Sequence, residues 1–162
     1  MKKSSSPTDN FDLWVLIAQT RDALFKVRQK ELSQRNISVM KVAVLFFVRQ
    51  IGNRATPAEI SRWIFRQPHS VSGLLSRMEK EGLVRKVKDL DKKNMVRVTL
   101  TEKGEQAYYR SLERDSVNRV ISSLSEEECQ QLRPILRKLR AGALTELGMD
   151  QRPLLPHFDK SA

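Results

Sequence analysis

Residues 68–85 read PHSVSGLLSRMEKEGLVR, and this stretch decides the fold. Its apolar residues recur at the i, i+3, i+4 and i+7 spacing of a helix that faces a core: Val71, Leu74, Leu75 and Met78. The opposite face and its flanks carry small or basic side chains and no carboxylate: His69, Ser70, Ser72, Gly73, Ser76, Arg77 and Lys80. The pattern predicts an amphipathic helix from Pro68 to about Lys80 that stops at Gly82.

The polar face of this helix suits an approach to DNA. Small hydroxyls and a glycine let a helix come close to base edges, while Arg77 and His69 can donate hydrogen bonds to bases or phosphates. The alternative is an ordinary solvent-exposed face. Such faces usually mix Glu with Lys, whereas the acidic residues here come only at the end of the helix, at Glu79 and Glu81. The DNA-facing interpretation is therefore favoured.

Two helices are expected upstream of this stretch. Ser38 can cap a helix over residues 39–50, whose side chains are apolar almost all round. A short helix over residues 57–65 begins with TPAE, the pattern of a capping box with Pro at the first helical position. Two helices in close succession, the second with a polar face, are typical of a helix-turn-helix.

A β-hairpin is expected downstream. After Gly82 the apolar period changes from 3.6 to 2, and two strand candidates, residues 83–88 and 95–100, flank the charged turn 89–94. Helix, short helix, helix and basic hairpin together form a winged helix-turn-helix. The predicted fold class is therefore mainly α with a small β-hairpin wing.

Further helices flank this unit on both sides. Residues 11–31 contain no Gly or Pro and carry apolar side chains on two sides of a helix. This indicates a contact with a second copy of the chain, and a central core helix is the alternative. The region after Thr101 predicts one long helix to about residue 124, followed by a last helix over residues 126–147. Pro134 should kink the last helix or mark its start.

The net charge is concentrated in the middle of the chain. The 30 Lys and Arg against 19 Asp and Glu give a formal charge of +11. Residues 49–103 carry 13 basic and 6 acidic side chains, whereas residues 104–162 carry 9 of each. A basic middle beside a neutral end is what a localised polyanion-binding surface produces. A solvated surface with an excess of basic residues is the alternative.

The composition excludes several classes of protein. Hydrophobic residues make up 40% of the chain, which is typical of a globular domain, and no apolar run approaches the ~20 residues of a membrane span. A single cysteine excludes an internal disulfide, and with only two distant histidines no metal site of Cys and His is expected. No phosphate-binding Gly-rich loop and no catalytic triad is evident. We expect a soluble, cytoplasmic protein that is not an enzyme and has no cofactor.

The sequence resembles the MarR family of transcription regulators. The resemblance rests on VSGLLSRMEKEGLVR at residues 71–85, on Asp91 in the wing, and on VTLTEKG at residues 98–104. The specific matches lie between residues 70 and 104, while the order of helices fits the family over about residues 11–147. The family implies a homodimer that places two winged helices on a near-palindromic site in double-stranded DNA, usually as a repressor.

This resemblance implies a domain organisation. Residues 36–101 would form the winged helix-turn-helix DNA-binding domain, and residues 11–35 and 102–148 the dimerisation helices. Residues 1–10 and 149–162 are expected to be tails, the first of them flexible.

The resemblance also implies which residues contact DNA. The major-groove candidates are His69, Ser70, Ser72, Gly73, Ser76 and Arg77. The candidates in the wing, beside the minor groove, are Arg85, Lys86, Lys88, Asp91, Lys92, Lys93 and Asn94. The candidates for phosphate contacts are Arg49, Arg54, Thr56, Arg62 and Arg66. Where the family usually has Arg at the tip of the wing, this chain has Lys93, which lacks the planar fork of a guanidinium.

Many family members leave DNA when a small aromatic or phenolic ligand binds between the dimerisation helices and the DNA-binding domain. Four aromatic residues are candidates to line such an effector pocket: Trp14, Phe46, Phe47 and Trp63. Plain core packing of these side chains is the alternative.

The main functional hypothesis is a homodimeric, sequence-specific, ligand-released regulator. The second is an architectural DNA-binding protein of low specificity with the same fold.

Overall fold

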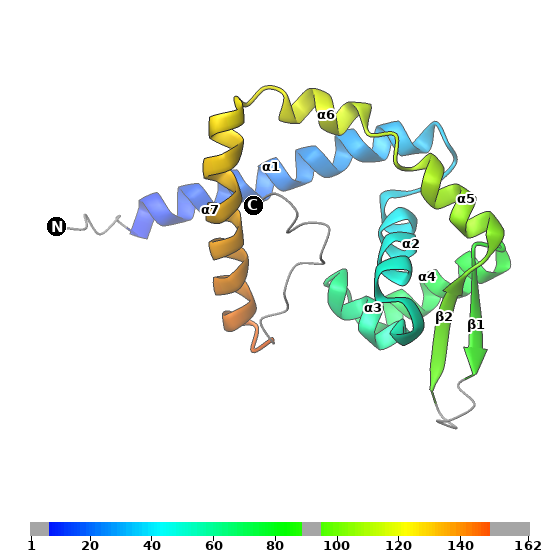
Figure 1. Ribbon diagram of the computed structural model, residues 1–162. Coiled ribbons are helices and arrows are strands. Elements are labelled where there is room, and N and C mark those ends of the chain that lie inside the picture. The colour runs from blue at the N-terminus through cyan, green and yellow to red at the C-terminus, as the bar shows by residue number, and fades with distance from the viewer. Residues whose placement is uncertain (1–6, 89–94, 150–162) are drawn as a thin grey trace. The chain divides into compact units, whose positions relative to one another are not determined.

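The computed structural model describes residues 7–88 and 95–149. Over these ranges the regular secondary structure is helical apart from one two-stranded antiparallel sheet (Figure 1). In order, the elements are α1 (Pro7–Ser33), α2 (Val39–Ile51), the 3₁₀ turn η1 (Gly52–Arg54), α3 (Pro57–Trp63), α4 (Pro68–Lys80), β1 (Val84–Lys88), β2 (Val96–Leu100), α5 (Glu102–Arg110), α6 (Asp115–Ile121) and α7 (Glu126–Glu146). The predicted fold class, mainly α with a β-hairpin, is confirmed. The chain divides into two compact units, with the boundary between Val117 and Asn118.

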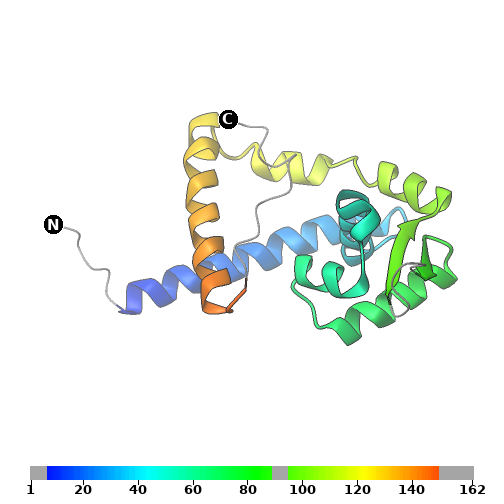
Figure 2. The ribbon, with the colours of Figure 1, turned by 60° about the horizontal axis from the view of Figure 1, so that its bottom comes forward.

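One core holds α2, α3, α4, α5 and the hairpin together, and this assembly is called the winged lobe (residues 38–88 and 95–110). Figure 2 shows these elements gathered together after a 60° turn, as in Figure 1. Each element contributes fully or nearly fully buried side chains, among them Leu45, Ile60, Leu75, Met78, Val84, Val98 and Tyr108. The apolar stripe predicted for α4 faces this core, with Leu74 partly buried at its margin.

Hydroxyl caps begin the helices of the winged lobe where the sequence predicts them. Ser38 Oγ accepts from the backbone N–H of Lys41 at 3.2 Å, and Thr56 Oγ1 accepts from that of Glu59 at 3.1 Å. The Glu59 carboxylate also accepts from Trp63 Nε1 at 3.1 Å. The prediction that α3 continues to Phe65 is wrong by two residues, because Phe65 has a left-handed φ of 53°, which ends a helix.

The hairpin pairs Val84 with Leu100 and Lys88 with Val96, and Lys86 lies opposite Val98. The backbone N–H groups of Lys86 and Val98 point away from the partner strand, and each donates to a neighbouring element. The N–H of Lys86 donates to the Glu79 carboxylate of α4 at 2.8 Å, and the N–H of Val98 donates to the Ala55 carbonyl at 2.7 Å. The strands are thus anchored on one side to α4 and on the other to the segment before α3.

The first helix is longer than predicted and largely exposed. It begins at Pro7 rather than near Phe11, so residues 7–10 are helical and do not belong to a flexible tail. Several large apolar side chains lie on its surface with exposed fractions of 37% to 63%: Phe11, Leu13, Trp14, Leu16, Ile17, Leu24 and Val27. The alternative of a central core helix therefore does not describe this part of α1.

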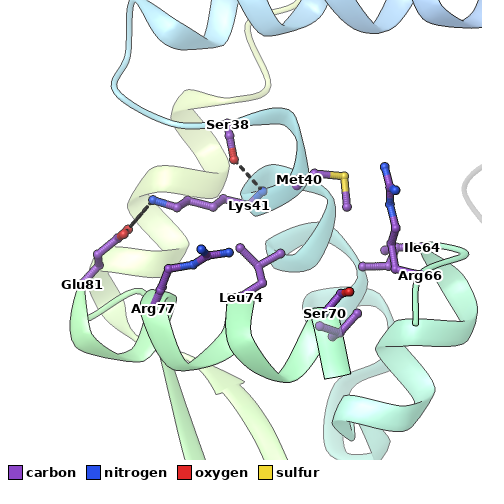
Figure 3. A pocket seen from close by; sticks show the side chains of 10 residues that line it. Ser38, Met40, Lys41, Ile64, Arg66, Ser70, Leu74, Arg77 and Glu81 are labelled. Carbon is purple, nitrogen blue, oxygen red and sulfur yellow. Dashed lines mark hydrogen bonds and ion pairs between the residues drawn. The ribbon is translucent and has the colours of Figure 1, made fainter. Parts of the chain in front are cut away.

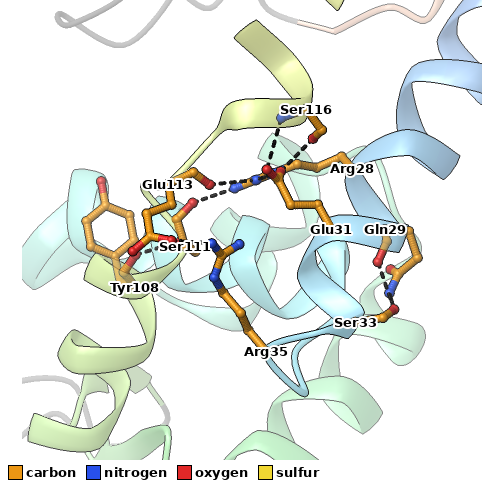
Figure 4. Close-up of polar contacts among 9 residues, drawn as sticks. All are labelled: Arg28, Gln29, Glu31, Ser33, Arg35, Tyr108, Ser111, Glu113 and Ser116. Carbon is orange, nitrogen blue, oxygen red and sulfur yellow. Dashed lines mark hydrogen bonds and ion pairs between the residues drawn. The ribbon is translucent and has the colours of Figure 1, made fainter. Parts of the chain in front are cut away.

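The prediction of one long helix from residue 102 to about 124 is wrong. The chain forms α5 and α6 with a break between them, and Arg28 of α1 binds the backbone carbonyls at this break (Figure 4). The Arg28 guanidinium donates to the carbonyl of Ser111 and, at 2.9 Å, to the carbonyl of Glu113. These bonds satisfy carbonyls that the end of α5 leaves without a partner inside the helix.

Glu31, one turn along α1 from Arg28, caps the start of α6. Its carboxylate pairs with Arg28 and accepts from the backbone N–H of Ser116 at 3.0 Å and from the Ser116 hydroxyl. Its side chain is only 11% exposed. Burial opposes its ionisation, but the hydrogen bonds from Ser116 and Arg28 outweigh this and lower the pKa of Glu31 to about 2. A charged pair of α1 thereby orders the segment that joins α5 to α6.

The second unit contains most of α6 and all of α7. Ser125 and Glu128 form a complete capping box at the start of α7, as predicted. Pro134 lies inside α7 and does not mark its start. Further apolar side chains of this unit are exposed: Ile121, Leu132, Ile135, Leu136, Leu139 and Leu147. No helix in residues 7–88 and 95–149 is sufficiently long and apolar to span a membrane.

Candidate nucleic-acid interface

The burial of one side of α4 determines which side chains it presents to solvent. Val71, Leu75 and Met78 are buried, so the helix cannot rotate without exposing them. The opposite side is exposed at His69, Ser70, Ser72, Gly73 and Arg77, and half-buried at Ser76. All six residues predicted for the major groove therefore share one arc of α4. This arc has no carboxylate, and hydroxyl and basic groups on it can donate to base edges and phosphates.

The side chains of the wing residues differ in their exposure and in their hydrogen bonds. Arg85 and Lys88 are exposed on β1, where they are available to a polyanion. Lys86, in contrast, is only 26% exposed, and its ammonium donates to Ser76 Oγ at 2.8 Å. Two predicted DNA contacts are thus bonded to each other. The predictions for Asp91, Lys92, Lys93 and Asn94 lie outside the described residues.

Three of the candidate phosphate contacts are exposed on or next to α3 and the turns that flank it. Arg54 and Arg66 lie in the turns, and Arg62 lies 3.6 Å from the Glu59 carboxylate on α3. Thr56 caps α3, so its hydroxyl is already engaged as an acceptor.

Arg49 has a structural environment that the sequence did not indicate. Its guanidinium pairs with Glu105, donates to the Tyr109 hydroxyl at 2.8 Å, and lies 5.3 Å and 5.0 Å from the ring centroids of Tyr108 and Tyr109. These contacts tie α2 to α5.

A cavity of about 530 Å³ lies beside α4, in the winged lobe (Figure 3). Its lining consists of Ser38, Met40, Lys41, Ile64, Arg66, Ser70, Val71, Leu74, Arg77 and Glu81. Lys41 forms an ion pair with Glu81 at 2.7 Å across its edge, which leaves Arg66 and Arg77 as the other charged groups of the lining. No sequence pattern indicates this cavity, because its walls come from segments that meet only in the folded chain.

The four aromatic candidates for an effector pocket fall into two groups. Phe46, Phe47 and Trp63 form a row, with ring centroids 5.1 Å apart for the first pair and 5.6 Å for the second. Trp14 stacks instead on Phe11 of α1, at 5.9 Å, and is 63% exposed. None of the four lines the cavity beside α4.

Comparisons with known proteins agree with this geometry. A family model described as a winged helix DNA-binding domain matches residues 38–104. The organohalide-sensing RdhR-CbdbA1625 transcriptional regulator, solved with 2,4-dichlorophenol and without ligand, is 34% identical, with a TM-score of 0.80 and 96% of each chain covered. A search of curated protein sequences gave no match.

More distant structures share the fold. A mutant MarR from E. coli in complex with operator DNA is 21% identical, with a TM-score of 0.75, covering 84% of this chain and 99% of that one. MepR from S. aureus, in a complex with DNA, is also 21% identical, with a TM-score of 0.70, covering 79% and 96%. Taken with the match over nearly the whole length of the 34% identical regulator, these findings show that the chain belongs to the MarR family of winged-helix, DNA-binding transcription regulators.

Proposed function

We propose that this chain is a homodimeric, sequence-specific regulator that represses its target genes and leaves DNA when a small aromatic compound binds. The observation that carries the proposal is the exposed arc of α4, in which hydroxyl and basic groups lie together without a carboxylate. Residues 36–101 would bind DNA, and residues 11–35 and 102–148 would form the dimer. The contacts to DNA would come from α4, from the exposed wing residues, and from Arg54, Arg62 and Arg66.

The proposed function can be tested with DNA from upstream of the protein's own gene. Fluorescence anisotropy of a labelled duplex is compared with that of a scrambled duplex of equal length at increasing salt. An affinity for the upstream duplex about 10³-fold or more above that for the scrambled duplex, persisting near physiological salt, supports sequence-specific regulation. Equal binding of both duplexes, lost together as salt rises, supports the architectural alternative of low specificity. A reporter gene behind the same DNA distinguishes repression from activation.

Arg77→Ala is expected to weaken operator binding about ten- to a hundred-fold, since a guanidinium on the exposed arc can donate two hydrogen bonds to a base or phosphate. The fold should be unchanged, because the side chain is exposed. Arg21→Ala is the matched control: this arginine is exposed on α1, and its partners Asp22 and Phe25 lie on the same helix. The same anisotropy titration measures both variants. Equal affinities of Arg77→Ala and wild type would remove Arg77 from the interface.

The dimer is supported by the exposed apolar side chains of α1, because several large apolar groups on one helix favour burial against a partner. Leu16, 60% exposed, is a suitable position to test. Leu16→Glu is expected to shift the sedimentation mass from dimer towards monomer, because burying a carboxylate in an apolar interface is costly. Gln19→Glu, an exposed position of the same helix, should leave the mass unchanged. A dimer that persists in Leu16→Glu at micromolar concentration would place the interface elsewhere.

A phenolic effector is supported by the 34% identical relative, which was solved with 2,4-dichlorophenol bound. Two places in this chain offer suitable chemistry, the aromatic row of Phe46, Phe47 and Trp63 and the cavity beside α4. Because Ser70 and Arg77 line that cavity, a ligand there would compete with DNA for the same side chains. Adding 2,4-dichlorophenol to the preformed complex should lower the anisotropy. Unchanged anisotropy across a panel of phenols and aromatic acids would leave regulation without such an effector.

A further inference from the structure

Lys86 and Ser76 form a bridge between the wing and α4. The Lys86 ammonium lies 2.8 Å from Ser76 Oγ and 3.7 Å from a carboxylate oxygen of Glu79. The other carboxylate oxygen of Glu79 accepts from the backbone N–H of Lys86 at 2.8 Å. Glu79 therefore contacts both the backbone N–H and the ammonium group of Lys86. The ammonium group in turn donates to Ser76, a residue of the exposed arc.

The chemistry of the two groups determines how the Ser76 hydroxyl is oriented. An ammonium can only donate, so Ser76 Oγ is the acceptor in this bond. The hydroxyl hydrogen must then point away from the cation. Among the residues that the structure describes, no hydrogen bond uses the Ser76 hydroxyl as a donor, so this hydrogen is available to a ligand of α4.

We infer that Lys86 and Glu79 are positioning residues that make Ser76 a hydrogen-bond donor towards DNA. The inference rests on the proposed function, in which α4 enters the major groove. A donor in the groove favours base edges that accept, such as N7 and O6 of guanine, N7 of adenine or O4 of thymine, over the amino group of cytosine. Lys86 thus acts on base preference through Ser76 and does not serve mainly as a phosphate contact.

The inference is tested by selecting preferred sites from a randomised duplex library with the full-length protein. Ser76→Ala and Lys86→Met should both relax the preference at the same base-pair position, from about tenfold to less than about threefold, and leave the other positions unchanged. Lys88→Met is the matched control, because Lys88 is the next lysine of β1 and is exposed. It should weaken binding to all sequences alike and lower the salt slope by about one.

The outcomes separate the inference from the proposed function. If Lys86→Met behaves like Lys88→Met, Lys86 is a phosphate contact and the inference is wrong. A wild-type preference for the amino group of cytosine at the position that Ser76→Ala relaxes would also overturn it, and this readout remains if Lys86→Met fails to fold. A wild-type protein that selects no sequence overturns the proposed function, and the inference with it.

Discussion

Gly104→Ala is expected to unfold the winged lobe, or to destabilise it by more than about 4 kcal/mol. A Cβ at this position would lie 2.0 Å from the carbonyl oxygen of Leu83 and 3.0 Å from its carbon. Both are backbone atoms, and the same oxygen accepts from the backbone N–H of Thr101 at 3.2 Å, so it cannot move aside without losing that bond. Gly104 therefore sets how closely α5 approaches the start of the wing.

Chemical denaturation followed by far-UV circular dichroism measures this effect. Gly73→Ala provides the control, because it makes the same substitution inside α4, where an added Cβ meets nothing within 4 Å. The free energy of unfolding of Gly73→Ala should rise by about 0.5–1 kcal/mol, because alanine has a higher helix propensity than glycine. A Gly104→Ala protein as stable as wild type would show that α5 and β1 can separate without cost.

Glu31→Gln is expected to destabilise the folded chain by about 3 kcal/mol at neutral pH. The carboxylate is nearly buried, pairs with Arg28 and caps α6 through Ser116. An amide retains one acceptor but leaves the Arg28 cation without its counter-charge. Glu113→Gln is the matched control, since Glu113 also pairs with an arginine, Arg35, but is 68% exposed, and such pairs contribute less than about 1 kcal/mol.

The pH dependence of this effect has a definite sign. The pKa of Glu31 falls from an ordinary 4.5 to about 2 in the folded chain. The folded state therefore binds the proton less readily than the unfolded state, and its stabilisation is complete above about pH 4.5 and is lost as the pH falls towards 2. The difference in unfolding free energy between wild type and Glu31→Gln should shrink over that range. A difference that stays constant from pH 7 to 3 would contradict the lowered pKa.

Local patterns predicted most of the winged lobe. The spacing of Val71, Leu75 and Met78 determined which side of α4 is buried, and the hydroxyl caps at Ser38 and Thr56 are where the sequence places them. These features depend on residues only a few positions apart, so they are visible in the sequence.

The larger errors involve contacts between residues distant in sequence. At the break after α5 the Ser111 carbonyl binds Arg28, more than 80 positions earlier, and no local pattern indicates this contact. The pairing of Lys86 with Ser76 and the packing of Arg49 on two tyrosines are equally non-local. Lys86 and Arg49 were candidate DNA contacts, because the sequence does not distinguish a cation facing solvent from one already paired in the folded chain.

A two-stranded sheet has two open edges, and an open edge can recruit a strand from another molecule. In this wing the middle N–H of each edge is already bonded, Lys86 to the Glu79 carboxylate and Val98 to the Ala55 carbonyl. A foreign strand would have to displace the charged acceptor to extend the β1 edge, or the backbone acceptor to extend the β2 edge. The wing should therefore resist edge-to-edge aggregation at the high protein concentrations used for crystallisation or nuclear magnetic resonance.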